Sequence, residues 1–482
     1  MRLFAPLFLV VGVALQAMAL CMLVTALIGW YFHTGNSAEF AYSALFCVIS
    51  GAVFFLTGLP HRSSHLLTRQ MFLITGGTWL LIPLFASLPL LFATTHLSFT
   101  DAVFETVSGI TTTGSTVLSG LDSIPPDILV WRSLLQWQGG VGIICMAVAL
   151  LPFLRIGGMR LFQTESSHWS DDNAPRARKL VESILYVYVL LTCLCVLSYV
   201  LTGMPLFDAV NNAFTTISTG GFSTSDRSFS DASLLTQWVA VVFMLAGAVP
   251  FVLYLQLFRA RFRDFFGDSQ VFVLLCIVFS LALAVAANLW LYHQNSPLVA
   301  LTRAAFNITS IITTTGFASD DYNHWGNFAI AAVFFATFVG GCSGSTSGGT
   351  KIFRLQLFFA LLKEQLARAV HPKITRAVSY NGKQVKSELV TALVAYFFVM
   401  LLCLIVITLG LAWTDLDLLS SITGASTALM NVGPGLGDVI GPAGNFSTLT
   451  DFGKWLLCFG MLLGRLEFLT ILILFTSSYW RG

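Results

Sequence analysis

Long apolar stretches constrain this sequence more than any other feature. A helix needs about 20 mostly apolar residues to cross a bilayer, and ten segments of the chain meet that length. They lie near residues 4–32, 38–59, 70–94, 128–152, 180–202, 233–258, 270–292, 326–361, 388–412 and 452–478. Only 10% of the 482 residues are charged, against about 25% in soluble domains. Because open strands cannot satisfy their backbone groups in lipid, the sequence predicts an all-α integral membrane protein with ten transmembrane helices.

The basic residues predict how these segments are oriented. With the N-terminus in the cytoplasm, 20 of the 25 lysines and arginines fall on the inner side, and Arg465 lies within the last segment. The other four fall on the outer side, namely Arg132, Arg227, Arg303 and Lys454. This bias is the positive-inside signature, so we expect both termini in the cytoplasm. The net charge of +2 indicates no bulk attraction to nucleic acid, and we expect no such partner.

Four similar polar turns follow short apolar stretches at a period close to one hundred residues. Aligned on a glycine, they read DAVFETVSGITTTGST (101–116), DAVNNAFTTISTGGFS (208–223), TRAAFNITSIITTTGFAS (302–319) and DLLSSITGASTALMNVGPG (417–435). The stretch before each glycine is too short to cross a bilayer and suits a re-entrant helix. The pattern predicts four span–pore-loop–span repeats, at 70–155, 176–264, 268–376 and 387–482, after a two-helix N-terminal unit at 1–69.

The composition of these turns indicates an ion pathway. Irregular backbone at membrane depth survives only where it is buried in protein or lines water. Four such turns on a pseudo-fourfold axis present rings of carbonyls and threonine hydroxyls, which replace the hydration shell of a potassium ion. Threonine and glycine are also common in ordinary turns, and small residues mediate helix packing in membranes. Four glycines at matching places favour the pore.

Taken over the whole chain, the four units resemble the Trk/Ktr/HKT superfamily of potassium transporters. The turns TTTGST, STGGFST, TTTGFASDD and NVGPGLG, with the two extra N-terminal spans, are similar to the bacterial TrkH/TrkG branch. The resemblance implies potassium uptake across the bacterial inner membrane by a homodimer. It also implies a filter lined by the carbonyls of Thr112, Thr113, Gly114, Thr219, Gly220, Gly221, Thr314, Thr315, Gly316, Asn431, Val432 and Gly433.

Two of these turns carry further implications. The fourth turn has Asn431 and Val432 before its glycine and Pro434 after it, which argues against strict fourfold geometry. In the plant branch of the superfamily, serine at the first filter glycine accompanies sodium selectivity. Since this chain has Gly114 there, the resemblance implies a preference for potassium.

The segment VGGCSGSTSGGTK, from Val339 to Lys351, interrupts the eighth apolar stretch with five glycines and three serines. Each glycine inside a helix costs about 1 kcal/mol relative to alanine, so a break is expected; a kinked or closely packed helix is the alternative. A flexible loop under the filter would serve as a gate, and the resemblance implies this role. The expected gate comprises Gly340, Gly341, Gly344, Ser345, Thr346, Ser347, Gly348, Gly349, Lys351 and Arg465.

Arg465 belongs to this set because an arginine within a span is costly and often marks an ion route. Glu467 is two residues away and faces another side of the helix, which makes it a poor partner. A structural ion pair with some other group is the alternative. The resemblance implies that Arg465 lies in the permeation path below the filter as an electrostatic barrier, and that Lys351 matches the family's basic residue after the loop.

Two polar inner segments, 155–179 and 363–386, carry basic clusters. These clusters could set the topology or bind anionic membrane lipid. The resemblance adds a ring of cytoplasmic nucleotide-binding subunits of the TrkA type on this face. The sequence has no phosphate-cradling GxxxxGK[ST] motif, so no nucleotide site is expected on this chain and any nucleotide control must come from a partner.

Other function classes fit less well. Nine cysteines without a CxxC pair indicate neither a zinc site nor a disulfide framework. Eight scattered histidines and the lack of HExxH or GxSxG motifs argue against an enzyme. A sodium- or proton-coupled solute symporter is the stronger alternative, since broken helices near the midplane also build such sites. Those transporters usually contain two repeats, whereas this sequence indicates four.

Overall fold

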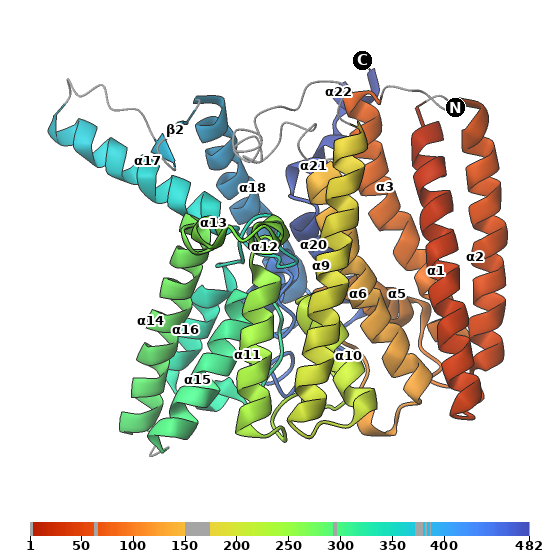
Figure 1. Ribbon diagram of the computed structural model, residues 1–482, viewed down its shortest axis with the longest axis horizontal. Coiled ribbons are helices and arrows are strands. Elements are labelled where there is room, and N and C mark those ends of the chain that lie inside the picture. Colours follow the sequence, from red (N-terminus) through yellow and green to blue (C-terminus); the bar gives the residue numbers. More distant parts are fainter. Residues whose placement is uncertain are drawn as a thin grey trace.

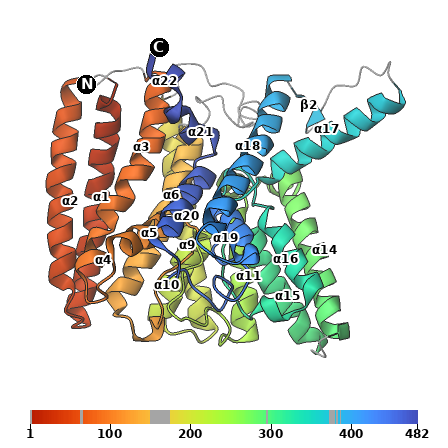
Figure 2. The same ribbon diagram turned by 180° about the vertical axis from the view of Figure 1, so that it is seen from behind.

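The computed structural model describes residues 3–61, 66–149, 174–292, 296–371, 379–380, 383–385 and 387–481. The described chain is mostly helical, and its one sheet is an antiparallel pairing of β1 (Ser379–Tyr380) with β2 (Lys383–Gln384). Most of the long helices stand side by side in one block, from which α17 (Ile352–Val370) projects to one side, and α22 (Ser477–Arg481) lies at the same end as the start of α1 (Figures 1 and 2). The inner segments 155–179 and 363–386 lie partly outside the described residues.

Six helical stretches among the described residues are long and apolar enough to cross a membrane. They are α1 (Ala5–Tyr31), α2 (Ser37–Gly58) with η1 (Leu59–His61), α3 (Thr68–Ala86) with α4 (Leu88–Phe92), α9 (Ala174–Leu201), α14 (Ser269–Tyr292) and α18 (Ser387–Ala412). The number rises to eight if each of two bent helix pairs is one span. The remaining predicted spans, 128–152 and 326–361, correspond to α6 (Pro126–Ala149) and to α16 (Asn327–Thr337) with α17 (Ile352–Val370).

Two segments that the sequence predicts as continuous spans are broken. In the segment 233–258, α11 (Leu234–Ala248) meets α12 (Phe251–Phe258) at 97°. In the segment 452–478, α20 (Asp451–Arg465) meets α21 (Leu469–Leu472) and η4 (Ile473–Phe475) at 108°. A hydropathy average cannot locate either break, because the helices on both sides of it are apolar.

Each break has an identifiable physical cause. Pro250 precedes α12; proline has no N–H to donate and disfavours helical backbone in the residue before it. The freed N–H of Phe251 donates to the carbonyl of Gly344, 3.1 Å away. At the second break, Glu467 has a φ of 66°, and its carboxylate pairs with Arg354 of α17. The first break therefore contacts the loop that contains Gly344, and the second contacts α17.

Four shorter helices end inside the block. They are α5 (Phe99–Ile110), α10 (Leu206–Ile217), α15 (Pro297–Ile312) and α19 (Leu418–Met430), and they lie in the half of the block away from α22 (Figures 1 and 2). Three of them begin at side-chain caps, in which Ser98, Ser296 and Asp417 accept a backbone N–H three residues on. The last three residues of each helix are buried, so the carboxyl ends of these helices place polar backbone groups in the protein interior.

The remaining short elements connect these helices. They are η2 (Leu121–Ser123), α13 (Phe262–Phe266) and η3 (Tyr322–His324). Along the chain, each of the four units therefore follows the order long helix, short buried helix, second helix. In the second, third and fourth units, that second helix is interrupted, and the interruptions meet near the ends of the short helices.

Candidate functional site

The same hydrogen-bond motif ends all four short helices. In α5, the N–H of Thr113 donates to the carbonyl of Ser108 at 2.9 Å, and the N–H of Thr112 donates to that of Gly109 at 3.0 Å. This pair of bonds is a Schellman motif, which requires a residue of left-handed backbone after the helix. The equivalent donors are Gly220 and Thr219, Thr315 and Thr314, and Val432 and Asn431. The four sequence repeats thus form four equivalent turns.

Each turn carries two residues of positive φ at the same spacing. The first is Thr112, Thr219, Thr314 or Asn431, with φ between 51° and 57°. The second is the aligned glycine, with φ of 88° at Gly114, 81° at Gly221, 85° at Gly316 and 112° at Gly433. A threonine in the left-handed region is strained, and such strain clusters at functional sites.

The fourth turn is closer to the others than its sequence predicts. Asn431 has a φ of 55°, within the range of the three threonines, because asparagine tolerates left-handed backbone. The larger difference is at Gly433, where φ reaches 112° before Pro434. Asn431 also donates from Nδ2 to Thr113 Oγ1 and to the carbonyl of Met461, each at 2.9 Å. The departure from fourfold geometry therefore begins after Asn431.

The aligned glycines bring the four turns together in a ring. A Cβ built on Gly114 would lie 2.3 Å from the carbonyl oxygen of Gly220. The other three glycines approach the next turn in the same way. A Cβ on Gly221 would lie 1.9 Å from the carbonyl oxygen of Thr315, one on Gly316 2.1 Å from that of Val432, and one on Gly433 2.8 Å from that of Thr113. The order closes on itself, so no side chain fits at any of the four glycines. The twelve predicted filter residues thus lie at one place.

A cavity of about 200 Å³ adjoins the four glycines. Its lining is mostly small or polar and includes Ser115, Ser223 and Asp226. Gly114, Gly221 and Gly316 are partly exposed there, whereas the residues just before them are buried. The ring is therefore accessible from this side through its glycines.

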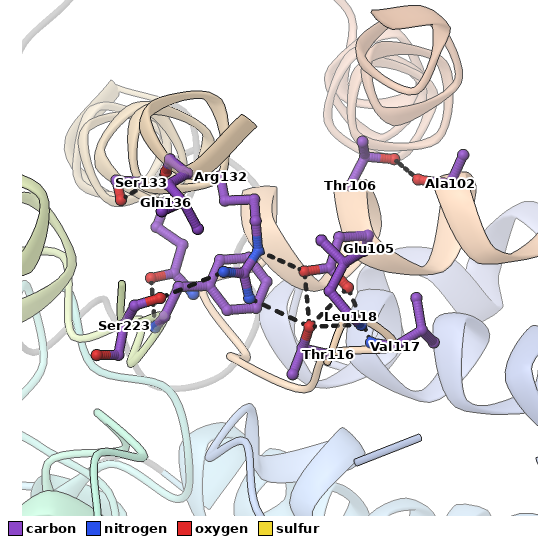
Figure 3. A network of polar contacts seen from close by, with 12 residues as sticks. Ala102, Glu105, Thr106, Thr116, Val117, Leu118, Arg132, Ser133, Gln136 and Ser223 are labelled. Carbon is purple, nitrogen blue, oxygen red and sulfur yellow. Dashed lines mark hydrogen bonds and ion pairs between the residues drawn. The ribbon is translucent and has the colours of Figure 1, made fainter. Parts of the chain in front are cut away.

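A buried polar network lies behind the first two turns (Figure 3). Glu105 of α5 pairs with Arg132 of α6 at 2.7 Å, with side chains 0% and 1% exposed. The carboxylate also accepts the hydroxyl of Thr116 and the N–H of Val117, each at 2.9 Å. From the sequence, Arg132 is assigned only to the outer side and Glu105 is not singled out, although an ionisable residue in a buried apolar helix is itself a signal of function.

The glycine-rich segment forms an extended loop across the opposite side of the ring from the cavity. Val339 and Thr350 pair in an isolated parallel bridge, which brings the two ends of the loop together. Thr346 Oγ1 lies 3.0 Å from the carbonyl of Ile217, and the N–H of Gly348 donates to Thr314 Oγ1 at 2.6 Å. A Cβ on Gly348 would lie 2.6 Å from the carbonyl of Met430. The loop therefore touches the ends of three of the four short helices.

The rest of the predicted gate segment holds this loop in shape. The bonds run from Gly340 N to Thr350 O at 2.9 Å, from Ile352 N to Gly341 O at 3.1 Å, from Phe251 N to Gly344 O at 3.1 Å and from Ser345 Oγ to Cys342 O at 2.6 Å. Lys351 Nζ donates to the carbonyl of Ser347. A small cavity of about 30 Å³ lies against this loop and is lined by Ser347, Gly349, Lys351 and Arg465 among others.

Arg465 lies against the same loop. Its Nη1 donates to the carbonyl of Thr346 at 2.8 Å, while Nε and Nη2 are buried and have no hydrogen-bond partner among the described residues. Glu467 pairs with Arg354 and not with Arg465; the cause is not a different face of one helix, because α20 ends at Arg465 and Glu467 lies in the break with a φ of 66°. No ion pair of Arg465 occurs within the described ranges, so the alternative of a structural ion pair lacks a partner there.

Comparison with known proteins places this geometry among cation transporters. The family model TrkH, described as a cation transport protein, matches residues 36–481. The chain is 47% identical to the Trk system potassium uptake protein TrkI of Halomonas elongata, over 86% of this chain and 84% of that protein. It is 33% identical to the Trk system potassium uptake protein TrkH of Escherichia coli K12, over 98% of both chains. The crystal structure of the potassium transporter TrkH from Vibrio parahaemolyticus is similar, with a TM-score of 0.91, 35% identity, and coverage of 99% of this chain and 100% of that one.

Proposed function

Because the chain belongs to the TrkH family of cation transport proteins, we propose that it carries potassium ions into the cell across the bacterial inner membrane. The observation that carries this proposal is the closed ring of four glycine turns, in which each turn's glycine lies against a carbonyl of the next turn. Its relatives are named potassium uptake proteins. A ring of backbone carbonyls is the ligand set that replaces water around potassium.

The proposed filter uses the backbone of the twelve residues from Thr112 to Gly433 named above. Positive φ two residues apart, as at Thr112 and Gly114, turns the intervening peptide groups so that carbonyls of neighbouring residues can face one axis. Two of these carbonyls already accept side-chain hydrogen bonds: Gly220 from Gln136 at 2.6 Å, and Gly433 from Ser115 at 2.9 Å. Since a carbonyl oxygen has two lone pairs, each retains one for an ion.

The proposed gate is the loop from Gly340 to Lys351 together with Arg465. This role is supported by the loop's contacts with Ile217 and Thr314, which lie on the side of the ring away from the outer cavity. A cation leaving the filter on this side meets the loop backbone and the positive charge of Arg465. Opening requires the loop to move and the guanidinium to turn aside.

The cellular arrangement completes the proposal. Both termini lie in the cytoplasm, in keeping with α22 and the start of α1 at one end of the block (Figure 1). The protein is a homodimer, and a TrkA-type nucleotide-binding subunit docks on the cytoplasmic face and controls the gate. Basic residues of that face contact anionic lipid. The relatives are named as parts of a Trk system, which agrees with the presence of a regulatory partner.

Ion flux from the purified protein tests this function. We expect protein reconstituted in liposomes to pass potassium down a potassium gradient with no sodium or pH gradient present, and to pass sodium more slowly. A sodium- or proton-coupled symporter, which broken helices can also build, would move an organic solute only under a gradient of the coupling ion. Absence of potassium flux both alone and with the nucleotide-binding partner would contradict the proposal.

A further inference from the structure

One face of α6 holds the first two turns of the ring. Arg132 and Gln136 are four residues apart and therefore point the same way along the helix. Gln136 donates from Nε2 to the carbonyl of Gly220 at 2.6 Å and accepts the N–H of Phe222 at 3.0 Å. It thus clamps the peptide groups on both sides of Gly221, the aligned glycine of the second turn.

Arg132 connects the same turn to the first one. Its Nη1 donates to the carbonyl of Ser223 at 3.3 Å, and its guanidinium lies 4.2 Å from the centre of the Phe222 ring. On the other side, Nε pairs with Glu105 and Nη2 donates to Thr116 Oγ1 at 3.1 Å. Figure 3 shows Arg132 lying between Ser223 on one side and Glu105 with Thr116 on the other. One side chain therefore fixes the separation of two turns.

The equivalent positions show that this link belongs to one side of the ring. The residue nine positions before each aligned glycine is Glu105, Asn212, Asn307 or Gly424. Asn307 accepts the N–H of Ser319 at 3.2 Å, as Glu105 accepts that of Val117, each donor lying three residues after its glycine. Among these four positions, only Glu105 supplies a charge and an ion pair to the following helix.

The cost of the pair indicates that it does more than stabilise the fold. Removing two charges from water is expensive, and replacement by well-packed apolar residues often leaves a protein equally stable. In this network both carboxylate oxygens and all three guanidinium nitrogens have partners. A fully satisfied buried network rigidifies the groups that it joins, and here those groups are two walls of the ring.

We propose that Glu105, Arg132 and Gln136 are positioning residues that set the spacing of the first two turns and thereby the discrimination of potassium from sodium. The inference rests on the proposed potassium filter. Selectivity in such filters depends on the size of the ring and on the number and field strength of its carbonyls. Gln136 holds the carbonyl of Gly220 directly, and the Glu105–Arg132 pair holds the turns that flank it.

Two variants test this role in the full-length protein. Gln136→Leu removes both clamp bonds and introduces no charge. The double variant Glu105→Gln with Arg132→Gln removes the ion pair and leaves neither charge unpaired. Arg303→Gln is the matched control, because Arg303 pairs with Asp320 at 2.8 Å beside the third turn but is 39% exposed. Gel filtration and the thermal midpoint in detergent report whether each variant is folded.

The readout is the ratio of potassium to sodium flux in liposomes, with the half-saturating potassium concentration measured separately from the maximal flux. For folded Gln136→Leu we expect this ratio to fall about tenfold, the scale of one strong hydrogen bond, while the control keeps the parental ratio. The same fall in the double variant supports the ion pair as part of the clamp. If folded Gln136→Leu keeps the parental ratio, the inference is overturned, whatever the double variant does. If the parent itself passes no potassium, the proposed function fails first.

Discussion

Arg465 Nη1 donates a hydrogen bond of 2.8 Å to the carbonyl oxygen of Thr346. This contact joins the break between α20 and α21 to the loop between α16 and α17, so interrupted helices of two different units meet beside the ring. Nε and Nη2 of the same guanidinium have no partner among the described residues. Arg465 can therefore hold the loop and present positive charge to a passing cation at the same time.

Replacement of this arginine should raise ion flux through the resting protein. A hydrogen bond to a charged group contributes about 1.5–3 kcal/mol, so we expect Arg465→Ala to increase basal potassium flux roughly tenfold or more. Arg465→Lys keeps the charge but loses the forked donor set of arginine. Its basal flux should lie between that of the parent and that of Arg465→Ala. Arg227→Ala is the control, because Arg227 and its partner Asp231 are largely exposed. Liposome flux without the nucleotide-binding partner is the measurement, and parental flux in Arg465→Ala would remove the residue from the barrier.

The hydroxyl of Thr346 offers a finer test of the loop. Thr346 Oγ1 lies within hydrogen-bond distance of the carbonyls of Ile217 and Gly247, at 3.0 and 2.9 Å. Thr346→Val keeps the shape but loses a bond of about 1 kcal/mol, so basal flux should rise roughly fivefold. Thr346→Ser retains the hydroxyl and should behave like the parent. Equal flux in the two variants would show that this hydroxyl does not hold the gate.

Shortening the loop should have a larger effect than either substitution. Deletion within Gly344–Gly349 removes the contact of Gly348 with Thr314 as well as that of Thr346 with Ile217. With the loop withdrawn from the ends of the short helices, basal potassium flux should rise and respond little to the regulatory partner. The measurement is flux with and without that partner. A folded deletion variant that still responds to the partner would place the gate elsewhere.

The turns could be predicted from the sequence because their chemistry is local and repeated. A glycine that closely follows a threonine, after a stretch too short to span, recurs in the first three units, and each instance forms the same Schellman motif. The fourth turn is also recognisable, but Asn431 and Val432 predict a departure from fourfold geometry, since the sequence does not show that asparagine and threonine share one backbone conformation there. The structure supplies that value of φ, 55° at Asn431.

The break at Glu467 and the buried pair of Glu105 with Arg132 could not be predicted in the same way, because they depend on distant residues. The turn at Glu467 has no glycine or proline nearby other than Gly464, and the carboxylate finds its partner in Arg354, 113 positions earlier. Likewise, Arg132 is buried against Glu105 only once α5 folds back beside α6. Counting the basic residues on each side of the membrane cannot predict either of these two ion pairs.

Gly114 tests the ring itself. Its φ is 88°, and a Cβ there would lie 2.3 Å from the carbonyl oxygen of Gly220, closer than non-bonded atoms approach. Gly114→Ser must therefore displace the first turn, the second, or both. Because the displaced carbonyls are proposed ligands, we expect the ratio of potassium to sodium flux to fall while the protein remains folded.

The control for Gly114→Ser must separate the effect of backbone strain from the effect of displacing the carbonyls of the ring. Gly120 has a φ of 72°, is exposed, and a Cβ there meets only Ser123 Oγ at 3.4 Å. Gly120→Ser carries a similar conformational penalty, about 1 kcal/mol, without touching a carbonyl of another turn. Its thermal midpoint should fall slightly and its flux ratio should stay at the parental value. If Gly114→Ser also keeps the parental ratio, selectivity does not reside in this ring, because its steric effect on the Gly220 carbonyl cannot be avoided.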